Sequence, residues 1–120
     1  MSPDELIDLL KRGQPVTFAQ TISVIDASYR YLPTRFRNGI GADAVVNEAG
    51  ANEGSCKIFY FAYLHGLDEG QTLSLFGDFY RSDVLGHPSG QNHPNIRRFM
   101  RDGWKGIRYD GTALVVPEAE

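Results

Sequence analysis

Residues 55–64 read Ser-Cys-Lys-Ile-Phe-Tyr-Phe-Ala-Tyr-Leu, which is the most apolar stretch of the chain. Because nearly every position is apolar, periodicity alone does not separate a buried strand from a buried helix. The length of the run, a cap at Ser55 and a stop at Gly66 favour a helix. We therefore expect a buried central helix here.

Three capping boxes mark the starts of further helices, because each pairs a polar cap residue with Glu or Gln three positions later. They begin at Ser2, Thr17 and Asp68. Pro33 should end the second helix, since the residue before a proline is pushed out of helical geometry. The helices predicted from these boxes cover residues 3–12, 17–32 and 68–80.

A last helix is expected to begin at Pro94, because proline suits the first helical position. Asn92 or His93 would cap it, after a turn-rich break at residues 86–90. The side chains that this helix should carry inward are Ile96, Phe99, Met100 and Trp104.

The β content is expected to be minor. Residues 33–54 form a long glycine-rich loop with two short extended pieces, at 35–37 and 44–47. Tyr109-Asp110-Gly111-Thr112 is a turn signal, which predicts a C-terminal hairpin between Ile107 and residues 113–116. Residues 117–120 should be frayed. The fold class is therefore mainly α, a single compact domain over 1–120 with about five helices.

The composition is that of an ordinary soluble domain. Of 120 residues, 42% are hydrophobic and 22% are charged, which excludes a disordered chain. Twelve basic and fifteen acidic residues give a net charge of −3, which argues against nucleic acid as a partner. No apolar run approaches the roughly 18 residues of a membrane span. We expect neither a nucleic acid nor a membrane partner.

The common metal and disulfide frameworks are also excluded. Cys56 is the single cysteine, so neither an intramolecular disulfide nor a multi-cysteine zinc site can form. His65, His87 and His93 share no helical ligand spacing, so no metal and no cofactor is expected. The chain opens with a capped acidic helix in place of an export signal, which favours a cytosolic location.

The densest polar cluster is the loop 47–57, which leads into the central helix. A glycine-containing loop at a helix N-terminus exposes unpaired N–H groups, which favour an anion. It does not match a P-loop, whose glycines have a different spacing. The ordinary alternative is a capped helix start in which Glu53 pairs with Lys57. The residues expected to bind a ligand are Asn52, Gly54, Ser55 and Lys57.

Cys56 is a candidate reactive thiol, because it lies in the first helical turn beside Lys57. A nucleophile needs a base, and His65 lies on the opposite helix face. His93 could reach Cys56 only through tertiary folding. The alternative is that Cys56 is a small buried hydrophobe. The catalytic candidates are Cys56, Glu53 and His93.

One basic stripe follows the last helix, where basic residues recur every four positions. It is either a contact surface for an acidic partner or an ordinary solvated face, and the acidic net charge favours the second interpretation. The residues of this candidate interaction surface are Arg97, Arg101 and Lys105.

Over residues 15–107 the chain resembles the HopJ type III effector family. The blocks that carry the resemblance include Thr17-Phe18-Ala19-Gln20-Thr21-Ile22, Asn52-Glu53-Gly54-Ser55-Cys56-Lys57, Leu64-His65-Gly66-Leu67 and Asn95-Ile96-Arg97. The resemblance implies a protein of the bacterial cytoplasm or, as the family name suggests, one injected into a host cell by type III secretion. It implies no particular reaction.

Two functions remain open at this level. The first is a protein that acts by binding a protein or a small ligand, without catalysis. The second is a small enzyme or ligand receptor that uses the Asn47–Lys57 loop, with Cys56 as its reactive thiol.

Overall fold

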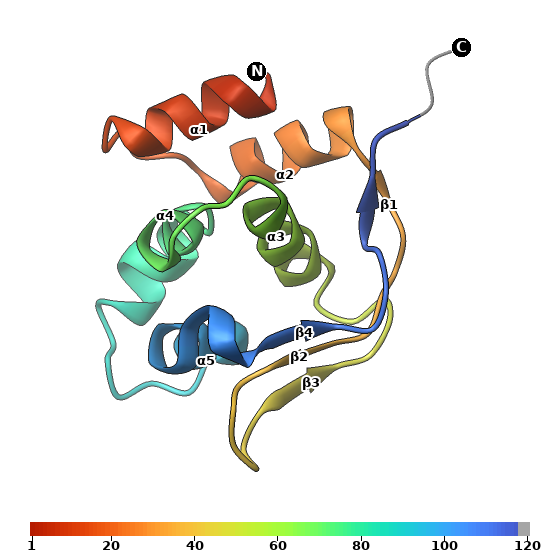
Figure 1. Cartoon of the computed structure of the whole chain (residues 1–120). Helices are drawn as coiled ribbons and strands as arrows, with labels where there is room; N and C mark the ends of the chain where they lie inside the picture. The colour runs from red at the N-terminus through yellow and green to blue at the C-terminus, as the bar shows by residue number, and fades with distance from the viewer. Residues whose placement is uncertain (118–120) are drawn as a thin grey trace.

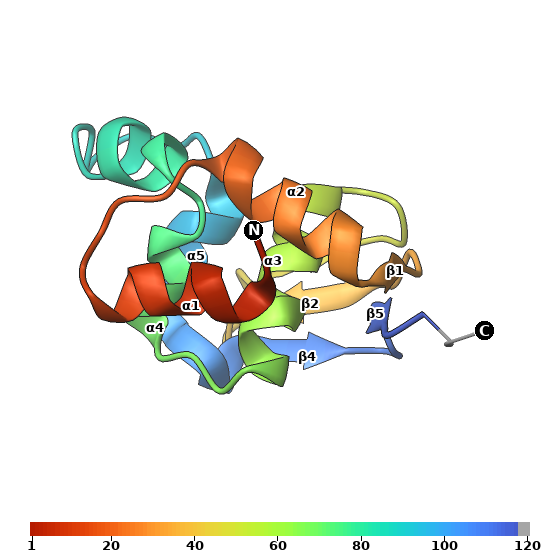
Figure 2. The same ribbon diagram turned by 90° about the horizontal axis from the view of Figure 1, so that it is seen from above.

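Helix α3 (Glu53–Leu64) lies at the centre of the fold, as expected for the apolar stretch that it contains (Figure 1). α1 (Pro3–Lys11) and α2 (Phe18–Ser28) cover one side of it, and Figure 2 shows this layer from above. α4 (Glu69–Ser74) and α5 (Pro94–Asp102) lie on another side, and a small sheet on a third. The chain is seen here in a computed structural model, which describes residues 1–117.

The core is built around the aromatic rings that α3 sends inward. Phe59 is fully buried, and its ring centroid lies 4.9 Å from that of Phe99 and 5.4 Å from that of Phe76. Phe36, from the sheet, lies 6.1 Å away in an edge-to-face arrangement. Aromatic pairs at these separations add about 0.5–1.5 kcal/mol each beyond their burial. Phe59 therefore joins the central helix to three other parts of the fold.

Five short strands form two antiparallel sheets within residues 1–117. In the larger sheet β2 (Phe36–Asn38) lies between β3 (Val45–Asn47) and β4 (Ile107–Tyr109). The smaller sheet pairs β1 (Arg30–Tyr31) with β5 (Leu114–Val115). The extended pieces expected at 35–37 and 44–47 are thus a paired hairpin, and the sheet content exceeds the minor β element predicted.

The C-terminal hairpin prediction is wrong. β4 pairs with β2, where Asn38 faces Ile107, and β5 pairs with β1, where Arg30 faces Val115. The turn at Asp110 redirects the chain from one sheet to the other, and its N–H donates to the Arg35 carbonyl. Partners distant in sequence therefore replace the local pairing. Of the residues predicted to fray, 118–120 lie outside the described residues.

The three capping boxes are confirmed, but two of the helices end early. α2 stops at Ser28 instead of reaching residue 32, because Tyr29 is extended and leads into β1. Strand pairing with β5 here overrides the helical pattern. Ser55 is not the cap of α3 either, since the N-cap is Asn52 and Ser55 lies inside the helix.

The helix predicted over residues 68–80 is broken at Gly77. α4 ends at Ser74, and a π-helix, η1 (Phe79–Val84), follows after a turn. Gly77 has φ +63°, and a Cβ there would lie 2.6 Å from the backbone nitrogen of Phe18. The close approach of the chain before α2 therefore requires glycine at this turn.

α5 begins at Pro94 with His93 as its N-cap, but it ends at Asp102 and is followed by the 3₁₀-helix η2 (Gly103–Gly106). Ile96 and Phe99 are buried as expected, whereas Met100 is 44% exposed. The prediction that Met100 faces the core is therefore wrong. Trp104, on η2, is partly buried and donates its indole N–H to the Leu67 carbonyl at 3.0 Å.

We predict that Gly77→Ala destabilises the protein by about 2–5 kcal/mol. Positive φ costs an alanine about 1–2 kcal/mol, and the clash with the chain before α2 adds about 1–3 kcal/mol. Gly13→Ala is the matched control, because Gly13 has φ +71° and a Cβ there would have no neighbour within 4 Å. Urea denaturation should show a loss of only about 1–2 kcal/mol for the control. Equal losses would contradict the close-approach argument.

Candidate functional site

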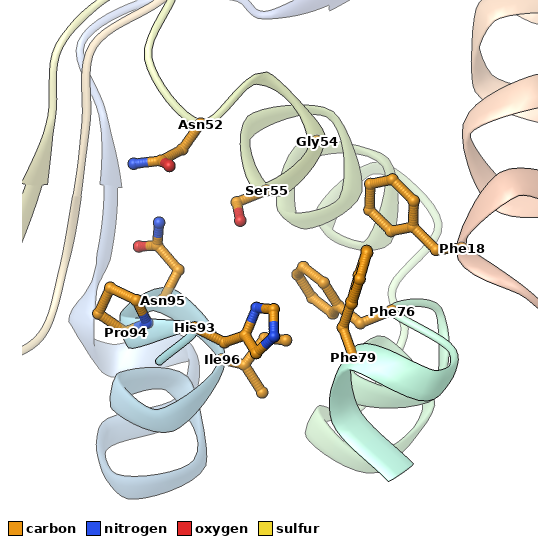
Figure 3. A pocket seen from close by; sticks show the side chains of 10 residues that line it. All are labelled: Phe18, Asn52, Gly54, Ser55, Phe76, Phe79, His93, Pro94, Asn95 and Ile96. Atoms are coloured by element: carbon orange, nitrogen blue, oxygen red, sulfur yellow. The ribbon is translucent and has the colours of Figure 1, made fainter. Parts of the chain in front are cut away.

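A cavity of about 280 Å³ lies where the N-terminal ends of α3 and α5 meet (Figure 3). Its walls come from α2, α3, the segment from Phe76 to η1, and α5. Asn52, Gly54, Ser55 and His93, all predicted from the sequence as site residues, line this one cleft. The other lining residues are Phe18, Phe76, Phe79, Pro94, Asn95 and Ile96.

One wall of the cleft is a row of three rings. The Phe18 and Phe79 centroids are 4.9 Å apart and nearly edge to face, and the Phe79 and His93 centroids are 5.1 Å apart. Phe18 also packs on α3, where a Cβ at Gly54 would lie 2.7 Å from its ring. Glycine at this position therefore lets the ring lie directly against the helix backbone.

The two helices that open into the cleft have no side-chain caps, unlike α1, α2 and α4. Asn52 and His93 are their N-cap residues, and both have φ of 51°. The first backbone bonds into α3 and α5 come from Cys56 N–H and Arg97 N–H. The amides before these have no partner within their own helices, and the N-terminal ends of helices carry partial positive charge.

A network of asparagine amides holds these two helix ends against the sheet. Asn95, on α5, and Asn47, on β3, are buried and exchange hydrogen bonds of 2.8 and 3.1 Å between their side chains. Asn38, on β2, donates to the Asn95 carbonyl at 2.8 Å, and Asn52 donates to Asn47 Oδ1 at 2.7 Å. Because buried amides are costly unless paired, the network fixes the relative position of all four elements.

His93 pairs with a carboxylate behind it. Its Nε2 lies 2.9 Å from Oδ2 of Asp83, which is on the π-helix η1. Since the carboxylate accepts, Nε2 carries the proton in the neutral ring, and Nδ1 is then an acceptor. Figure 3 shows the His93 ring and the Ser55 hydroxyl turned into the same space.

Cys56 does not line the cleft. It is fully buried, and burial raises the pKa of its thiol above the ordinary value. Its Sγ lies 3.6 Å from the carbonyl oxygen of Thr34, and no histidine or carboxylate accepts from it within residues 1–117. Burial and a raised pKa both disfavour an activated nucleophile, and they fit the alternative of a small buried hydrophobe.

The two charged neighbours of Cys56 also lie outside the cleft lining. Glu53 is exposed in the first turn of α3, where its charge suits the helix dipole. Lys57 donates to Asp26 at 2.8 Å and lies over the Tyr31 ring, so the expected Glu53–Lys57 pair does not form. Lys57 contacts α2 and β1 instead of a ligand site.

The basic stripe is interrupted, because α5 carries Arg97 and Arg101 but ends at Asp102, before Lys105. Arg97 donates to the carbonyls of His87 and Asn92, so it braces the loop before the helix. Arg101 pairs with Asp43 and Asp102, and this pairing lowers the pKa of Asp102 to about 2. Lys105 is exposed on η2, beyond the helix end. Two of the three charges are therefore committed to contacts within the chain.

Sequence reasoning missed Asp83, the three phenylalanines and the buried asparagines. Asn47 and Asn95 carried a usable signal, because each is a polar residue within or beside an apolar segment. Asp83 carried none, since no local pattern indicates the π-helix on which it lies.

Within residues 1–117 no group of three His, Cys, Asp or Glu side chains is placed to hold a metal ion. None of the helices described there has the length and apolar character needed to cross a bilayer.

Comparisons with known proteins support the family resemblance. The family model described as HopJ type III effector protein matches residues 4–114. The crystal structure of the unknown-function protein VPA0580 superposes with a TM-score of 0.89 at 42% sequence identity, covering 95% of this chain and 92% of that one. A search among curated proteins finds no match.

We predict that Asn47→Ala destabilises the protein by about 2–4 kcal/mol, because the side-chain amides of Asn95 and Asn52 both lose their acceptor. Asn92→Ala is the control, since Asn92 is exposed and accepts only from Arg97 among side chains. The loss of unfolding free energy in Asn92→Ala should stay below about 1 kcal/mol. Chemical denaturation of both variants measures this difference, and similar losses would show that the network does not hold the fold.

Proposed function

The chain belongs to the HopJ type III effector family, and we propose that it acts by binding a small anion that carries a flat ring, in the cleft between α3 and α5. The cleft itself is the observation that supports the proposal, because α3 and α5, neither of which has a side-chain cap, both open into it. Asn47 and Asn95, beside the cleft, are buried and exchange side-chain hydrogen bonds that fix the helix ends, which favours a pre-formed site.

The size and lining of the cleft favour a small ligand. About 280 Å³ is just below the usual range of ligand pockets, which is roughly 300–1,000 Å³. Phe18, Phe76 and Phe79 supply an apolar surface, and Phe79 is 40% exposed. An exposed aromatic ring beside a cavity offers a stacking surface to a planar ligand.

The opposite side of the cleft favours a negatively charged group. Backbone N–H groups in the first turns of α3 and α5 are donors, and the dipoles of both helices place positive potential there. Of the carboxylates near the cleft, Asp83 is paired with His93 behind it. Glu48 pairs with Arg35 at 3.3 Å, and neither Glu48 nor Glu53 lines the cleft. A carboxylate would therefore meet donors on two sides.

The proposal is independent of where the protein acts. The family description associates these chains with type III secretion. Binding would occur in the bacterial cytoplasm or, after secretion, in a host cell, and the same cleft would serve in either place.

Titration with benzoate, followed by ¹H–¹⁵N NMR, tests the proposal. We expect the amide signals of Gly54, Ser55, Asn95 and Ile96 to shift together with one saturation curve. Benzyl alcohol, which keeps the ring but lacks the charge, should bind more weakly because it gives the helix ends only a neutral acceptor. Shifts confined to other surfaces, or equal affinity for both compounds, would contradict an anion site here.

Phe79→Ala should weaken benzoate binding roughly two- to tenfold, since one aromatic contact contributes about 0.5–1.5 kcal/mol. Leu85→Ala is the matched control, because Leu85 is a similarly exposed apolar side chain that follows the same π-helix but lies outside the cleft. The affinity of Leu85→Ala for benzoate should equal that of the wild type. A loss shared by both variants would point to a general effect on η1.

A further inference from the structure

We propose that the Asp83–His93 pair makes this cleft a hydrolytic site for small aryl esters, with His93 as the general base that activates water. The inference rests on the proposed function, because the ester would occupy the same cleft that binds the ring-bearing anion. His93 is the catalytic residue, and Asp83 is a positioning residue that acts through it.

The pair has the arrangement that general-base catalysis needs. Asp83 Oδ2 accepts from His93 Nε2 at 2.9 Å, which orients the ring and selects the tautomer whose Nδ1 has a free lone pair. The contact with Asp83 engages Nε2 and does not use Nδ1. His93 lines the cavity, and Phe79 packs against its ring with the centroids 5.1 Å apart. The base is therefore fixed in place and open on the side of the cleft.

His93 reaches this position through an unusual backbone conformation. It is one of two non-glycine residues with positive φ in the described chain, and it precedes Pro94, which disfavours right-handed helical geometry at His93. A left-handed non-glycine residue costs about 1–3 kcal/mol. Such strain is found where surrounding structure holds a residue for function, and here it turns the imidazole into the cleft.

The far side of the cleft can stabilise the charge that forms during hydrolysis. Gly54 and Ser55 lie in the first turn of α3, where backbone N–H groups have no intrahelical acceptor. The Ser55 hydroxyl points into the same space as the His93 ring (Figure 3). Donors of this kind, set opposite a base, match an oxyanion site.

The chemical step balances without a cofactor. His93 Nδ1 takes a proton from water, and the water oxygen forms a bond to the ester carbonyl carbon. The carbonyl oxygen becomes an oxyanion facing the N-terminal turn of α3. When the intermediate collapses, the bond between the acyl carbon and the aryl oxygen breaks, and His93 returns its proton to the phenolate. The products are a carboxylic acid and a phenol.

Hydrolysis of phenyl acetate at near-neutral pH tests the proposal, with phenol release followed by absorbance. We expect release above the buffer blank in the wild type and a loss of about 100-fold or more in His93→Asn. Asparagine is chosen because it tolerates the left-handed backbone. His87→Asn is the control for adventitious imidazole catalysis, because His87 is exposed on a loop outside the cleft. The His87→Asn variant should release phenol at the wild-type rate.

Asp83→Asn distinguishes positioning from a merely structural role. We expect kcat to fall with KM unchanged, and the ¹⁵N spectrum of the His93 ring to lose the Nε2–H tautomer preference that the Asp83 contact predicts for the wild type. An unchanged tautomer with unchanged kcat would remove Asp83 from the mechanism and overturn the pair as proposed.

Benzoate titration separates this inference from the proposed function. Benzoate should still shift the Gly54 amide in His93→Asn, which also shows that the variant is folded. If benzoate binds the wild type but phenol release does not exceed the blank, or if His93→Asn is as active as the wild type, the hydrolytic inference is overturned while binding stands. If benzoate does not bind the wild type, the proposed anion-binding function is contradicted, whatever the rate of phenol release.

Discussion

The reciprocal amide pair between Asn47 and Asn95 is the contact on which the arrangement of this fold depends. It joins a strand to the first turn of α5, and Asn38 and Asn52 extend it to β2 and to the start of α3. Burial of these polar groups is favourable only while their bonds are intact, so the network allows one relative position of strand and helices. Apolar packing around Phe59 supplies cohesion, but such packing tolerates small shifts that the amides do not.

This constraint explains why a cleft exists at this point of the surface. The amides hold two helix ends side by side at its back, and Gly77 brings the start of α2 against the turn before η1, so that Phe18 meets Phe79. α3 and α5, which have no side-chain caps, both open into the cavity, whereas α2 contributes the Phe18 ring to its wall. This packing places an aromatic surface on one side of the cleft and the N-terminal ends of two helices on the other. The proposed ligand class and the chemistry proposed for Asp83 and His93 are both based on this arrangement.

Local signals in the sequence were sufficient for much of this structure. The capping boxes, the central apolar run and Pro94 predicted helix starts, because each depends on neighbours within four residues. The early end of α2 and the β4–β2 pairing depend on segments about 70 or more residues away, which no local pattern encodes. In the candidate site, Asn52, Gly54, Ser55 and His93 were candidates by type and by position at helix starts; they line the cleft, and their role in binding or catalysis stays a prediction. Cys56 shows the limit of that approach, since adjacent helical residues point about 100° apart, so Ser55 faces the cleft and Cys56 the core.

A crystal structure of the protein with benzoate tests the central claim most directly. The account predicts the carboxylate within hydrogen-bonding distance of first-turn amides of α3 and α5, and the ring against Phe18 and Phe79. The asparagine network should be unchanged from the ligand-free protein, because the site is pre-formed. Benzoate bound at another surface with the cleft empty would contradict the claim, as would a cleft that forms only after the Asn47–Asn95 pair has separated.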